Sequence, residues 1–264
     1  MSRSLPRPAG NPENTFYEGE PQILVNKLGI RDAAEMRRQE KLALGNAYQT
    51  VLSSRTHSQI TAATFKAIHA AIFGELYEWA GRWRTVNIAK DGMKWPNAAF
   101  LEQSMQSFEK DVLQPVNASE LRSEGDFCRA AARIHGEFIA VHPFREGNGR
   151  TARLACDLLA INAGLPILRY DRSPAGIERY VHANKLVVYR ADYSLLEDVF
   201  AEAIGRAREL RSSTDSSPTS KKFIEPPQQS ADSKAAIGKV LASDLATLDE
   251  SLVFTKKPDL EPER

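Results

Sequence analysis

The segment from His142 to Arg153 constrains the chain most strongly, because it combines groups that handle an anion with a break between two helices. It reads His-Pro-Phe-Arg-Glu-Gly-Asn-Gly-Arg-Thr-Ala-Arg. An imidazole can take up a proton near neutral pH, and a carboxylate can hold a hard divalent ion such as Mg²⁺. Glycines let main-chain N–H groups approach phosphate oxygens, and arginines clamp phosphates with forked donors. Together these residue types indicate a site that binds and transfers an anionic group.

The residues on either side of this segment predict two helices. Before it, apolar side chains recur at three- and four-residue steps and form one helix face. Ser123 with Asp126 is typical of a capping box at the start of that helix, and Pro143 disfavours a helical residue before it. An apolar helical pattern resumes after the Gly-Asn-Gly step at residues 147–149. This step therefore lies at the N-terminus of the second helix, where unpaired N–H groups and the helix dipole favour an anion.

The same segment matches, without a departure, the signature of the Fic family, His-x-Phe-x-(Asp/Glu)-Gly-Asn-Gly-Arg-x-x-Arg. Two other stretches resemble the family more loosely: residues 77–86 resemble the segment before its β-hairpin flap, and residues 86–95 resemble the flap itself. Residues 26–30 are similar to an N-terminal segment of bacterial members, so the resemblance covers residues 16–210. It implies an all-α fold, a Fic-fold helical bundle with one β-hairpin flap.

The resemblance also implies an activity, because Fic enzymes mostly transfer AMP from ATP to a hydroxyl side chain of another protein. His142 would be the general base that deprotonates the target hydroxyl, and Glu146 would hold Mg²⁺ or Mn²⁺ on the phosphates of ATP. Phe144 would anchor the loop in the core, and the flap at residues 86–97 would hold the target protein. The implied nucleotide contacts are Gly147, Asn148 and Gly149 as an anion cradle, Arg150 and Arg153 as neutralising cations, Lys90 and Asp91 at the flap tip, and Tyr180 and Asn184 in the base pocket.

Three alternatives stay open. Residues 147–152, with Asp171 downstream, also fit the Gly-x-Gly-x-x-Ala fingerprint of dinucleotide-binding proteins, although the helical pattern before them does not supply the strand that this fingerprint needs. A Fic-type transferase of UMP, phosphocholine or phosphate is the second alternative. Gly149 favours nucleotide transfer over phosphate transfer, since the phosphate-transferring branch carries lysine at that position. The third alternative, a non-catalytic binding module, conflicts with the intact motif.

Composition and charge argue against two classes of partner. The chain has 264 residues, of which 42% are hydrophobic, and this is enough for a proper core. A net charge of +1 gives no broad signal for nucleic acid, and no apolar run approaches the length of a membrane helix. We therefore expect neither nucleic-acid nor membrane binding. The N-terminus lacks the apolar core of a signal peptide, which favours a bacterial cytoplasmic location, with export into another cell as the alternative. Cys128 and Cys156 are expected to be buried free thiols.

The rest of the chain is mostly helical in pattern. Further helices are expected at residues 33–52, from Thr61, after Asn97, after Ser173 and after Ser194, the last with Glu197 completing a capping box. Asp91-Gly92 predicts a hairpin turn, with a strand over residues 85–88. The chain then divides into a flexible segment at 1–20, a Fic domain at 21–211, a Ser/Pro-rich linker at 212–231, and a tail at 232–264 with a short helix.

Histidine and tryptophan outside the motif carry less information. We interpret His135 as structural, because it has no clustered third ligand that would suggest zinc, and His69 has no context from which to assign a role. The three tryptophans, Trp79, Trp83 and Trp95, are interpreted as packing residues.

Many Fic enzymes carry an inhibitory helix with the pattern (Ser/Thr)-x-x-x-Glu-(Gly/Asn), whose glutamate pairs with the second motif arginine, here Arg153. Four Glu-Gly or Glu-Asn steps occur in this chain, and the residues four before each glutamate are Ala9, Asn14, Glu120 and His142. No step therefore has the required Ser or Thr. An unrestrained transferase would harm its host, so we expect a toxin with a small separate antitoxin that inserts a glutamate beside Arg153. An exported effector is the alternative.

Overall fold

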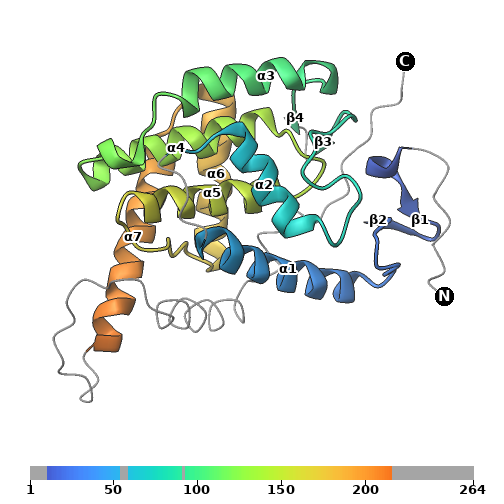
Figure 1. Cartoon of the computed structure of the whole chain (residues 1–264), viewed down its shortest axis with the longest axis horizontal. Coiled ribbons are helices and arrows are strands. Elements are labelled where there is room, and N and C mark those ends of the chain that lie inside the picture. Colours follow the sequence, from blue (N-terminus) through green and yellow to red (C-terminus); the bar gives the residue numbers. More distant parts are fainter. Residues whose placement is uncertain (1–10, 54–58, 91–92, 216–264) are drawn as a thin grey trace.

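The computed structural model describes residues 11–53, 59–90 and 93–215, and over these residues seven α-helices pack around one core (Figure 1). The all-α class expected from the sequence is confirmed. The helices are α1 Ala33–Ser53, α2 Ala62–Phe73, α3 Leu101–Phe108, α4 Glu124–Val141, α5 Asn148–Asn162, α6 Pro174–Arg190 and α7 Ser194–Asp215. The strand assumed by the dinucleotide-binding alternative is absent, because residues 138–141 lie in α4.

Helix α5 is the central element of the bundle. It packs against α4, α2 and α1, and every residue from Arg150 to Ala160 is buried. Figure 1 shows α1, α2, α5 and α4 in successive layers, with α3 outside them and α6 and α7 crossing on one side. The motif segment leads into the N-terminus of this central helix, so its position is fixed by the whole core.

Helix ends follow the capping signals of the sequence, with one exception. The side chains of Asp32 and Ser123 accept hydrogen bonds from main-chain N–H groups three residues later, at 2.8 and 3.1 Å. The expected cap at Ser194 is wrong, because Ser194 is itself the first residue of α7. Asp192 accepts from both the N–H and the hydroxyl of Ser194, at 3.0 and 2.7 Å. The carboxylate of Asp192 is charged and is therefore a stronger hydrogen-bond acceptor than the neutral hydroxyl of Ser194. The Ser194 hydroxyl donates to Asp192 instead of capping the helix.

The described residues contain two β-hairpins, whereas the sequence predicted one. The first pairs β1 Phe16–Tyr17 with β2 Glu20–Leu24, and the second, the flap, pairs β3 Ala89–Lys90 with β4 Met93–Lys94. The strand expected at residues 85–88 is also wrong. Its main-chain groups are taken by side chains, since the N–H of Thr85 donates to Glu13 and the carbonyl of Val86 accepts from Arg84. Regular pairing therefore starts only at β3.

Regular structure in the N-terminal segment begins at a lower residue number than expected. Residues 1–20 were expected to be loose, but Pro12–Asn14 forms a 3₁₀ turn and the first hairpin follows it. The Glu13 side chain is buried and accepts from the N–H of Thr85 at 2.7 Å, and its carbonyl accepts from Arg145 Nε at 2.7 Å. These partners lie far away in sequence, so no local pattern signals them. Residues 1–10 and the tail helix expected after residue 232 lie outside the described residues.

Two other boundaries differ from the sequence-based expectation. The helix expected after Asn97 has three parts: a 3₁₀ turn at Ala98–Phe100, then α3, then a π-helical turn at Glu109–Leu113. At the other end, α7 continues to Asp215, beyond the domain end expected at residue 211. Cys128 and Cys156 are buried and unbridged, as expected.

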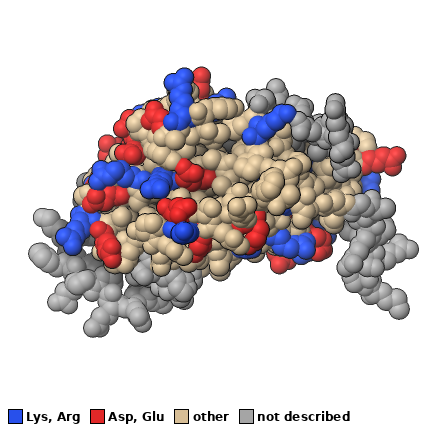
Figure 2. All heavy atoms as spheres, turned by 90° about the horizontal axis from the view of Figure 1, so that it is seen from above, with Lys and Arg blue, Asp and Glu red and all other residues tan. Residues whose placement is uncertain are grey.

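The surface carries both signs of charge. Lys and Arg side chains are interspersed with Asp and Glu side chains on the face shown in Figure 2, and neither sign dominates it. Among the helices that the structure describes, none is both long and apolar enough to cross a membrane.

His69, His135 and Asp157 are among the titratable side chains buried in the core. Burial lowers the pKa of His69 and of His135 from 6.5 to about 3. Burial raises the pKa of the Asp157 carboxyl to about 7, although it accepts hydrogen bonds from Tyr48 Oη and from the N–H of Leu168. The two histidines are therefore neutral in the folded protein at neutral pH, while Asp157 holds a proton more tightly in the folded than in the unfolded chain.

We expect the free energy of unfolding to fall in mild acid, and to fall more steeply in an Asp157→Asn variant. A lowered histidine pKa stabilises the fold above pH 6.5, and this contribution is lost as pH falls toward 3. As pH falls from 6.5 to 5, each of the two buried histidines lowers the free energy of unfolding by about 2 kcal/mol. The raised pKa of Asp157 opposes this, because it increases the free energy of unfolding by about 2 kcal/mol over the same pH interval. Denaturant unfolding at several pH values measures both slopes. Equal slopes in the wild-type and variant proteins would contradict the assignment.

Candidate active site

The motif loop begins where α4 ends. His142 is the C-cap residue of α4 and has left-handed backbone angles, φ 51° and ψ 57°, while its N–H still donates to the carbonyl of Phe138 at 2.9 Å. This conformation is unusual for a residue with a side chain, and Pro143 after it prevents the helix from continuing. The chain re-enters a helix after Gly147, which also has a positive φ, of 83°. The two left-handed residues give the loop its reversal between α4 and α5.

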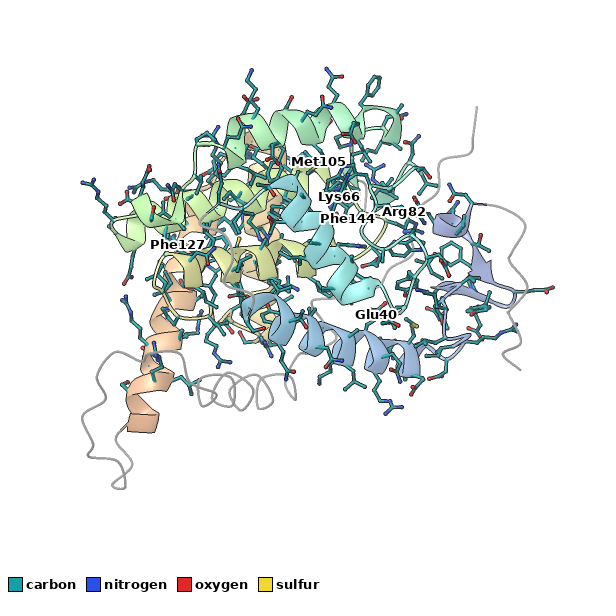
Figure 3. All side chains as sticks on the ribbon, in the orientation of Figure 1. Glu40, Lys66, Arg82, Met105, Phe127 and Phe144 are labelled. Atoms are coloured by element: carbon teal, nitrogen blue, oxygen red, sulfur yellow. The ribbon has the colours of Figure 1, made fainter. Side chains whose placement is uncertain are left out.

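Asn148 fixes the loop from inside. Its Oδ1 accepts from the N–H of Phe144 at 2.9 Å, and its Nδ2 donates to the carbonyl of Phe144 at 2.8 Å. Phe144 is fully buried in the centre of the bundle (Figure 3), which agrees with its expected role as an anchor. The side chain of Asn148 therefore closes the loop. Its main-chain N–H is the donor that remains for the anion-binding role that the sequence assigned to Asn148.

His69 on α2 supports the motif loop through its imidazole ring. Its ring stacks on Phe144, with ring centroids 3.7 Å apart. Its Nδ1 accepts from the N–H of Gly81 at 2.8 Å, so the ring proton is on Nε2, which donates to the carbonyl of Glu146 at 3.0 Å. Burial keeps this imidazole neutral, as its lowered pKa indicates. One neutral ring thus joins the segment before the flap to the motif loop.

His142 is oriented by a main-chain carbonyl. Its Nδ1 lies 3.2 Å from the carbonyl oxygen of Ile139, one turn back on α4. A carbonyl can only accept, so Nδ1 carries the proton and Nε2 is the nitrogen that can take one up. The carbonyl of His142 accepts from Nε of the buried Arg84 at 2.9 Å, and this fixes the backbone that carries the ring. The geometry therefore leaves Nε2 as the nitrogen of His142 that could accept a proton.

The two motif glycines are needed for different reasons. At Gly147 a Cβ atom would lie 2.2 Å from the Phe73 ring, and φ is positive, so the fold itself requires glycine. At Gly149 a Cβ atom would meet only ordinary contacts, 3.5 Å from Arg153 Nη1 and 3.9 Å from Tyr180 Oη. Nothing in the protein demands glycine there. The space that Gly149 leaves lies beside a cation and at the N-terminus of α5, where a phosphate would fit.

The two motif arginines are held differently. Arg150 is buried and donates to Glu40 on α1 at 2.7 Å, and its Nη2 lies 3.4 Å from Glu146 Oε1. Burial disfavours its charge, but the carboxylates of Glu40 and Glu146 outweigh this and raise the pKa of Arg150. Glu40 lies on the side of α1 that faces α2 (Figure 3), and it also accepts from Tyr77 Oη at 2.8 Å. Much of the charge of Arg150 is therefore already balanced within the protein.

Arg153 has a tyrosine as its hydrogen-bond partner, and no described carboxylate pairs with it. Its Nη1 donates to Tyr180 Oη at 3.2 Å, and Tyr180 Oη also lies 2.8 Å from Nε2 of the buried His135. Because His135 is neutral, the Tyr180 hydroxyl can donate to it while its oxygen accepts from Arg153. His135 is thus structural, as the sequence suggested. Its position keeps the Tyr180 oxygen available to Arg153.

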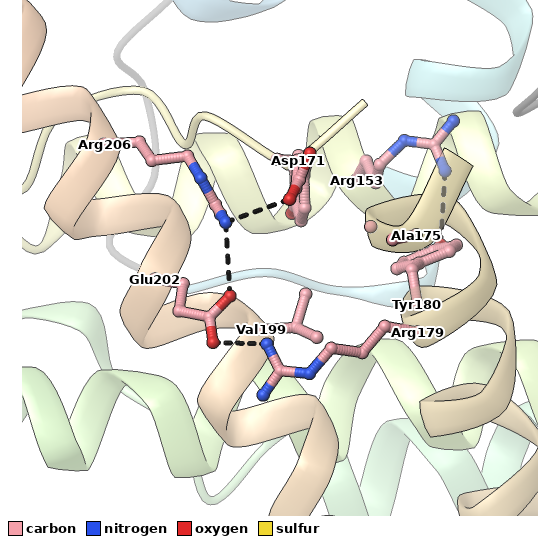
Figure 4. A pocket seen from close by; sticks show the side chains of 10 residues that line it. Arg153, Asp171, Ala175, Arg179, Tyr180, Val199, Glu202 and Arg206 are labelled. Atoms are coloured by element: carbon pink, nitrogen blue, oxygen red, sulfur yellow. Dashed lines mark hydrogen bonds and ion pairs between the residues drawn. The ribbon is translucent and has the colours of Figure 1, made fainter. Parts of the chain in front are cut away.

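A pocket opens beside Arg153 between α6 and α7 (Figure 4). Arg153 and Tyr180 form one end of it. At the other end Arg206 pairs with Asp171 and Glu202, at 3.2 and 3.3 Å. Arg179 at that end also pairs with Glu202, so two arginines balance two carboxylates there, and Arg153 supplies the excess positive charge in the pocket.

Glu146 is placed to hold a metal ion. Its side chain is 33% exposed, and its Oε1 accepts from the N–H of Gly147 at 3.0 Å. No group of three or more His, Cys, Asp or Glu side chains suited to a metal occurs among the residues that the structure describes. A lone carboxylate still fits Mg²⁺, which in nucleotide sites takes most of its other ligands from phosphates and water.

The remaining predicted contacts are placed only in part. Tyr180 lies beside Arg153, and its role in a base pocket stays a prediction. Asn184, one turn later on α6, is buried and donates to the carbonyl of Tyr180 at 2.8 Å, and its Oδ1 has no hydrogen-bond partner among the described residues. The main chain of Lys90 lies in β3, paired with Met93. Asp91 lies outside the described residues.

Four residues that contact this site were not connected with it from the sequence: Glu40, His69, Arg84 and Trp95, the last interpreted as a packing residue. Two of them have a visible signal, because Glu40 and His69 occupy core-facing positions of amphipathic helices. Glu40 lies between Met36 and Leu44, and His69 lies between Phe65 and Phe73, each at four-residue steps. A polar residue on a buried helix face needs a partner, and this requirement was available from the sequence. Arg84 and Trp95 lie in irregular segments that have no such pattern.

Comparisons with known proteins agree with this geometry. The family model for Fic/DOC matches residues 59–160. The protein adenylyltransferase VbhT of Bartonella schoenbuchensis is 32% identical over 175 residues, which cover 62% of this chain but only 35% of VbhT. The probable protein adenylyltransferase Fic of Salmonella typhimurium is 30% identical over 193 residues, which cover 71% of this chain and 90% of that protein.

A solved structure has the same fold. The crystal structure of BepC from Bartonella tribocorum, with bound AMPPNP, is 21% identical to this chain and superimposes with a TM-score of 0.57. The superposition covers 72% of this chain and 96% of that one.

The two glycines give a matched pair of variants. Gly147→Ala should lower the free energy of unfolding by roughly 3 kcal/mol, because the methyl group meets the Phe73 ring in a left-handed backbone. Gly149→Ala should leave thermal unfolding nearly unchanged, yet weaken ATP binding, because its methyl group occupies the space beside Arg153. Thermal unfolding and calorimetric titration with ATP separate the two effects. Wild-type ATP affinity in a folded Gly149→Ala protein would exclude this cradle.

Proposed function

The chain belongs to the Fic/DOC family, and we propose that it transfers AMP from ATP to a Tyr, Ser or Thr hydroxyl of a target protein. One observation carries the proposal: the contact of His142 Nδ1 with the Ile139 carbonyl leaves Nε2 as the nitrogen that can take up a proton, in the loop that leads into the N-terminus of α5. The intact motif, and relatives named as protein adenylyltransferases, support it. Gly149 favours a nucleotide over phosphate as the transferred group. UMP and phosphocholine are the alternatives that the test below distinguishes.

The reaction is an in-line displacement at the α-phosphorus of ATP. The target hydroxyl oxygen attacks this phosphorus while its proton passes to Nε2 of His142. A new oxygen–phosphorus bond forms, the bond from the α-phosphorus to the bridging oxygen breaks, and pyrophosphate leaves with that electron pair. The products are the AMP-modified target, pyrophosphate and a proton that His142 returns to solvent. The protein supplies position and charge neutralisation, and no covalent enzyme intermediate is needed.

The phosphates would lie on the first turn of α5. The main-chain N–H groups of residues 148–150 have no acceptor within the helix and point out of its N-terminus. Arg153 adds a side-chain cation on one side of this turn, next to the space left by Gly149. Arg150 would act through Glu146, whose carboxylate it contacts, and so hold that carboxylate in place. When bound there, Mg²⁺ or Mn²⁺ would neutralise charge on the phosphates.

The flap would hold the target protein. Residues 86–97 contain the two short strands β3 and β4, and a target segment can add to such an edge by main-chain hydrogen bonds. Main-chain pairing sets the register of the target and leaves its side chains largely unread. The target hydroxyl would then reach His142 because Arg84 ties both ends of the flap to the motif loop.

Control by a separate protein follows from the charge on Arg153. The chain lacks an inhibitory motif of its own among its Glu-Gly and Glu-Asn steps, and among the described residues Arg153 has Tyr180, not a carboxylate, as its hydrogen-bond partner. A glutamate from a small antitoxin, inserted beside Arg153, would pair with it and displace the terminal phosphate of ATP. We place this toxin in the bacterial cytoplasm. The alternative is an exported effector that needs no antitoxin in its own cell.

The decisive experiment supplies purified protein with labelled nucleotides and a cell lysate. ATP should label protein targets, and UTP, GTP, CTP and CDP-choline should label them weakly or not at all. His142→Ala should lower labelling by about 10²–10⁴-fold while ATP still binds, because the base acts on the target and the cradle acts on the phosphates. Glu146→Ala and excess chelator should each abolish labelling. Transfer at the wild-type rate by His142→Ala would refute the assignment of the base.

Expression of the chain alone in bacteria tests its control. We expect growth to slow, and the His142→Ala protein, produced at the same level, to leave growth unchanged. A matched variant, Arg153→Ala, should also relieve the effect because ATP is held less well. Normal growth with a soluble protein that modifies targets in vitro would exclude the toxin and favour the exported effector.

A further inference from the structure

We propose that Trp95 is a positioning residue for His142. Trp95 holds the His142 ring at the end of the flap and stabilises this ring when the ring becomes charged. This inference rests on the proposed role of His142 as the base. Trp95 directly follows β4 and is only half-buried, so it is not a core side chain like Trp79.

The two rings share one main-chain acceptor. The indole Nε1 of Trp95 donates to the carbonyl of Ile139 at 3.0 Å, and Nδ1 of His142 donates to the same carbonyl at 3.2 Å. A carbonyl oxygen has two lone pairs and can accept both bonds. The rings then lie face to face, with centroids 4.1 Å apart and planes inclined by 30°. The Ile139 carbonyl and the Trp95 ring together fix both the tautomer and the plane of His142.

Stacking of this kind has an electronic consequence. The face of an indole ring is negative and attracts a cation more strongly than a neutral ring. His142 is neutral before the reaction and positive once Nε2 has taken the proton of the target hydroxyl. Trp95 therefore stabilises His142 most when the transition state is reached, and such interactions raise kcat. The charged groups on the elements around His142 include Arg84, which binds the His142 carbonyl, Arg133 and Glu137 of α4, Lys94 of β4, and Arg145 and Glu146 of the loop.

The position of Trp95 also couples the base to the flap. Arg84 donates to the carbonyls of Val86 and Pro96, at 2.7 and 2.6 Å, and to that of His142 at 2.9 Å. Trp95 directly precedes Pro96, so the backbone of Trp95 is held in place by the same hydrogen bonds of Arg84. A target paired with the flap would therefore meet a histidine whose ring plane is set by the flap itself.

Kinetics of variants distinguish this role from simple packing. Trp95→Leu should lower kcat roughly tenfold and leave the KM for ATP within about twofold, because the cation–ring attraction is lost and the cradle is untouched. Trp95→Phe keeps the stacking but loses the bond to Ile139, so it should recover most of the lost rate. The acidic limb of the pH–rate profile should move to lower pH in Trp95→Leu. Equal kcat in Trp95→Leu and wild type would overturn the proposal, as would a loss confined to KM.

A second measurement needs no transfer activity, so it tests the contact even if the proposed function fails. Protonated imidazole quenches the fluorescence of a stacked indole. Tryptophan emission should therefore show a pH transition that is lost in both Trp95→Phe and His142→Gln. Trp83→Phe is the matched control and should keep the transition. Trp79 lies beside His69, whose pKa burial lowers to about 3. A transition that persists in Trp95→Phe, or is absent in the wild-type protein, would refute the contact. Circular dichroism melting confirms that each variant is folded.

Discussion

The site depends on one buried guanidinium. Arg84 is 2% exposed, and its side chain donates to three main-chain carbonyls, those of Val86, Pro96 and His142. Its own N–H donates to the carbonyl of Pro143. No carboxylate of the described residues forms an ion pair with it, and burial lowers its pKa to about 10, so it remains charged at neutral pH. A buried charge is stable only where hydrogen bonds compensate it, and here the compensation joins the start of the flap, its end and the base.

The motif loop is fixed by hydrogen bonds and an ion pair within the protein, so no ligand is needed to hold it. Asn148 closes the loop on Phe144, His69 joins Glu146 to Gly81, and Arg150 is balanced by Glu40. The positions of the catalytic groups are thus set before any nucleotide binds. Preorganisation of this kind is what a reaction with little covalent chemistry requires, because the enzyme acts by position and charge.

The sequence predicted the local parts of this arrangement and missed the long-range ones. Helix α5, the anion site at its start and the role of Phe144 followed from periodicity, from the motif and from the family resemblance. The burial of Glu13 and the contacts of Arg84 did not, since their partners lie up to 132 residues away and leave no periodic signal. The first hairpin pairs locally, but its strand β1 has only two residues and shows no alternating pattern. The strand expected at residues 85–88 failed because side chains, one from Glu13 and one from the neighbouring Arg84, take the hydrogen bonds that a local pattern assigns to a ladder.

The base and the phosphate cradle have different supports, and this separation bears on how the reaction is ordered. His142 is tied to the flap through Arg84 and Trp95, whereas the cradle belongs to α5 and to the cluster of Arg153, Tyr180 and His135. Binding of a nucleotide therefore need not move the base, and pairing of a target with the flap need not disturb the phosphates. The two substrates can be held independently, and the only group that must respond to both is the proton-accepting nitrogen of His142.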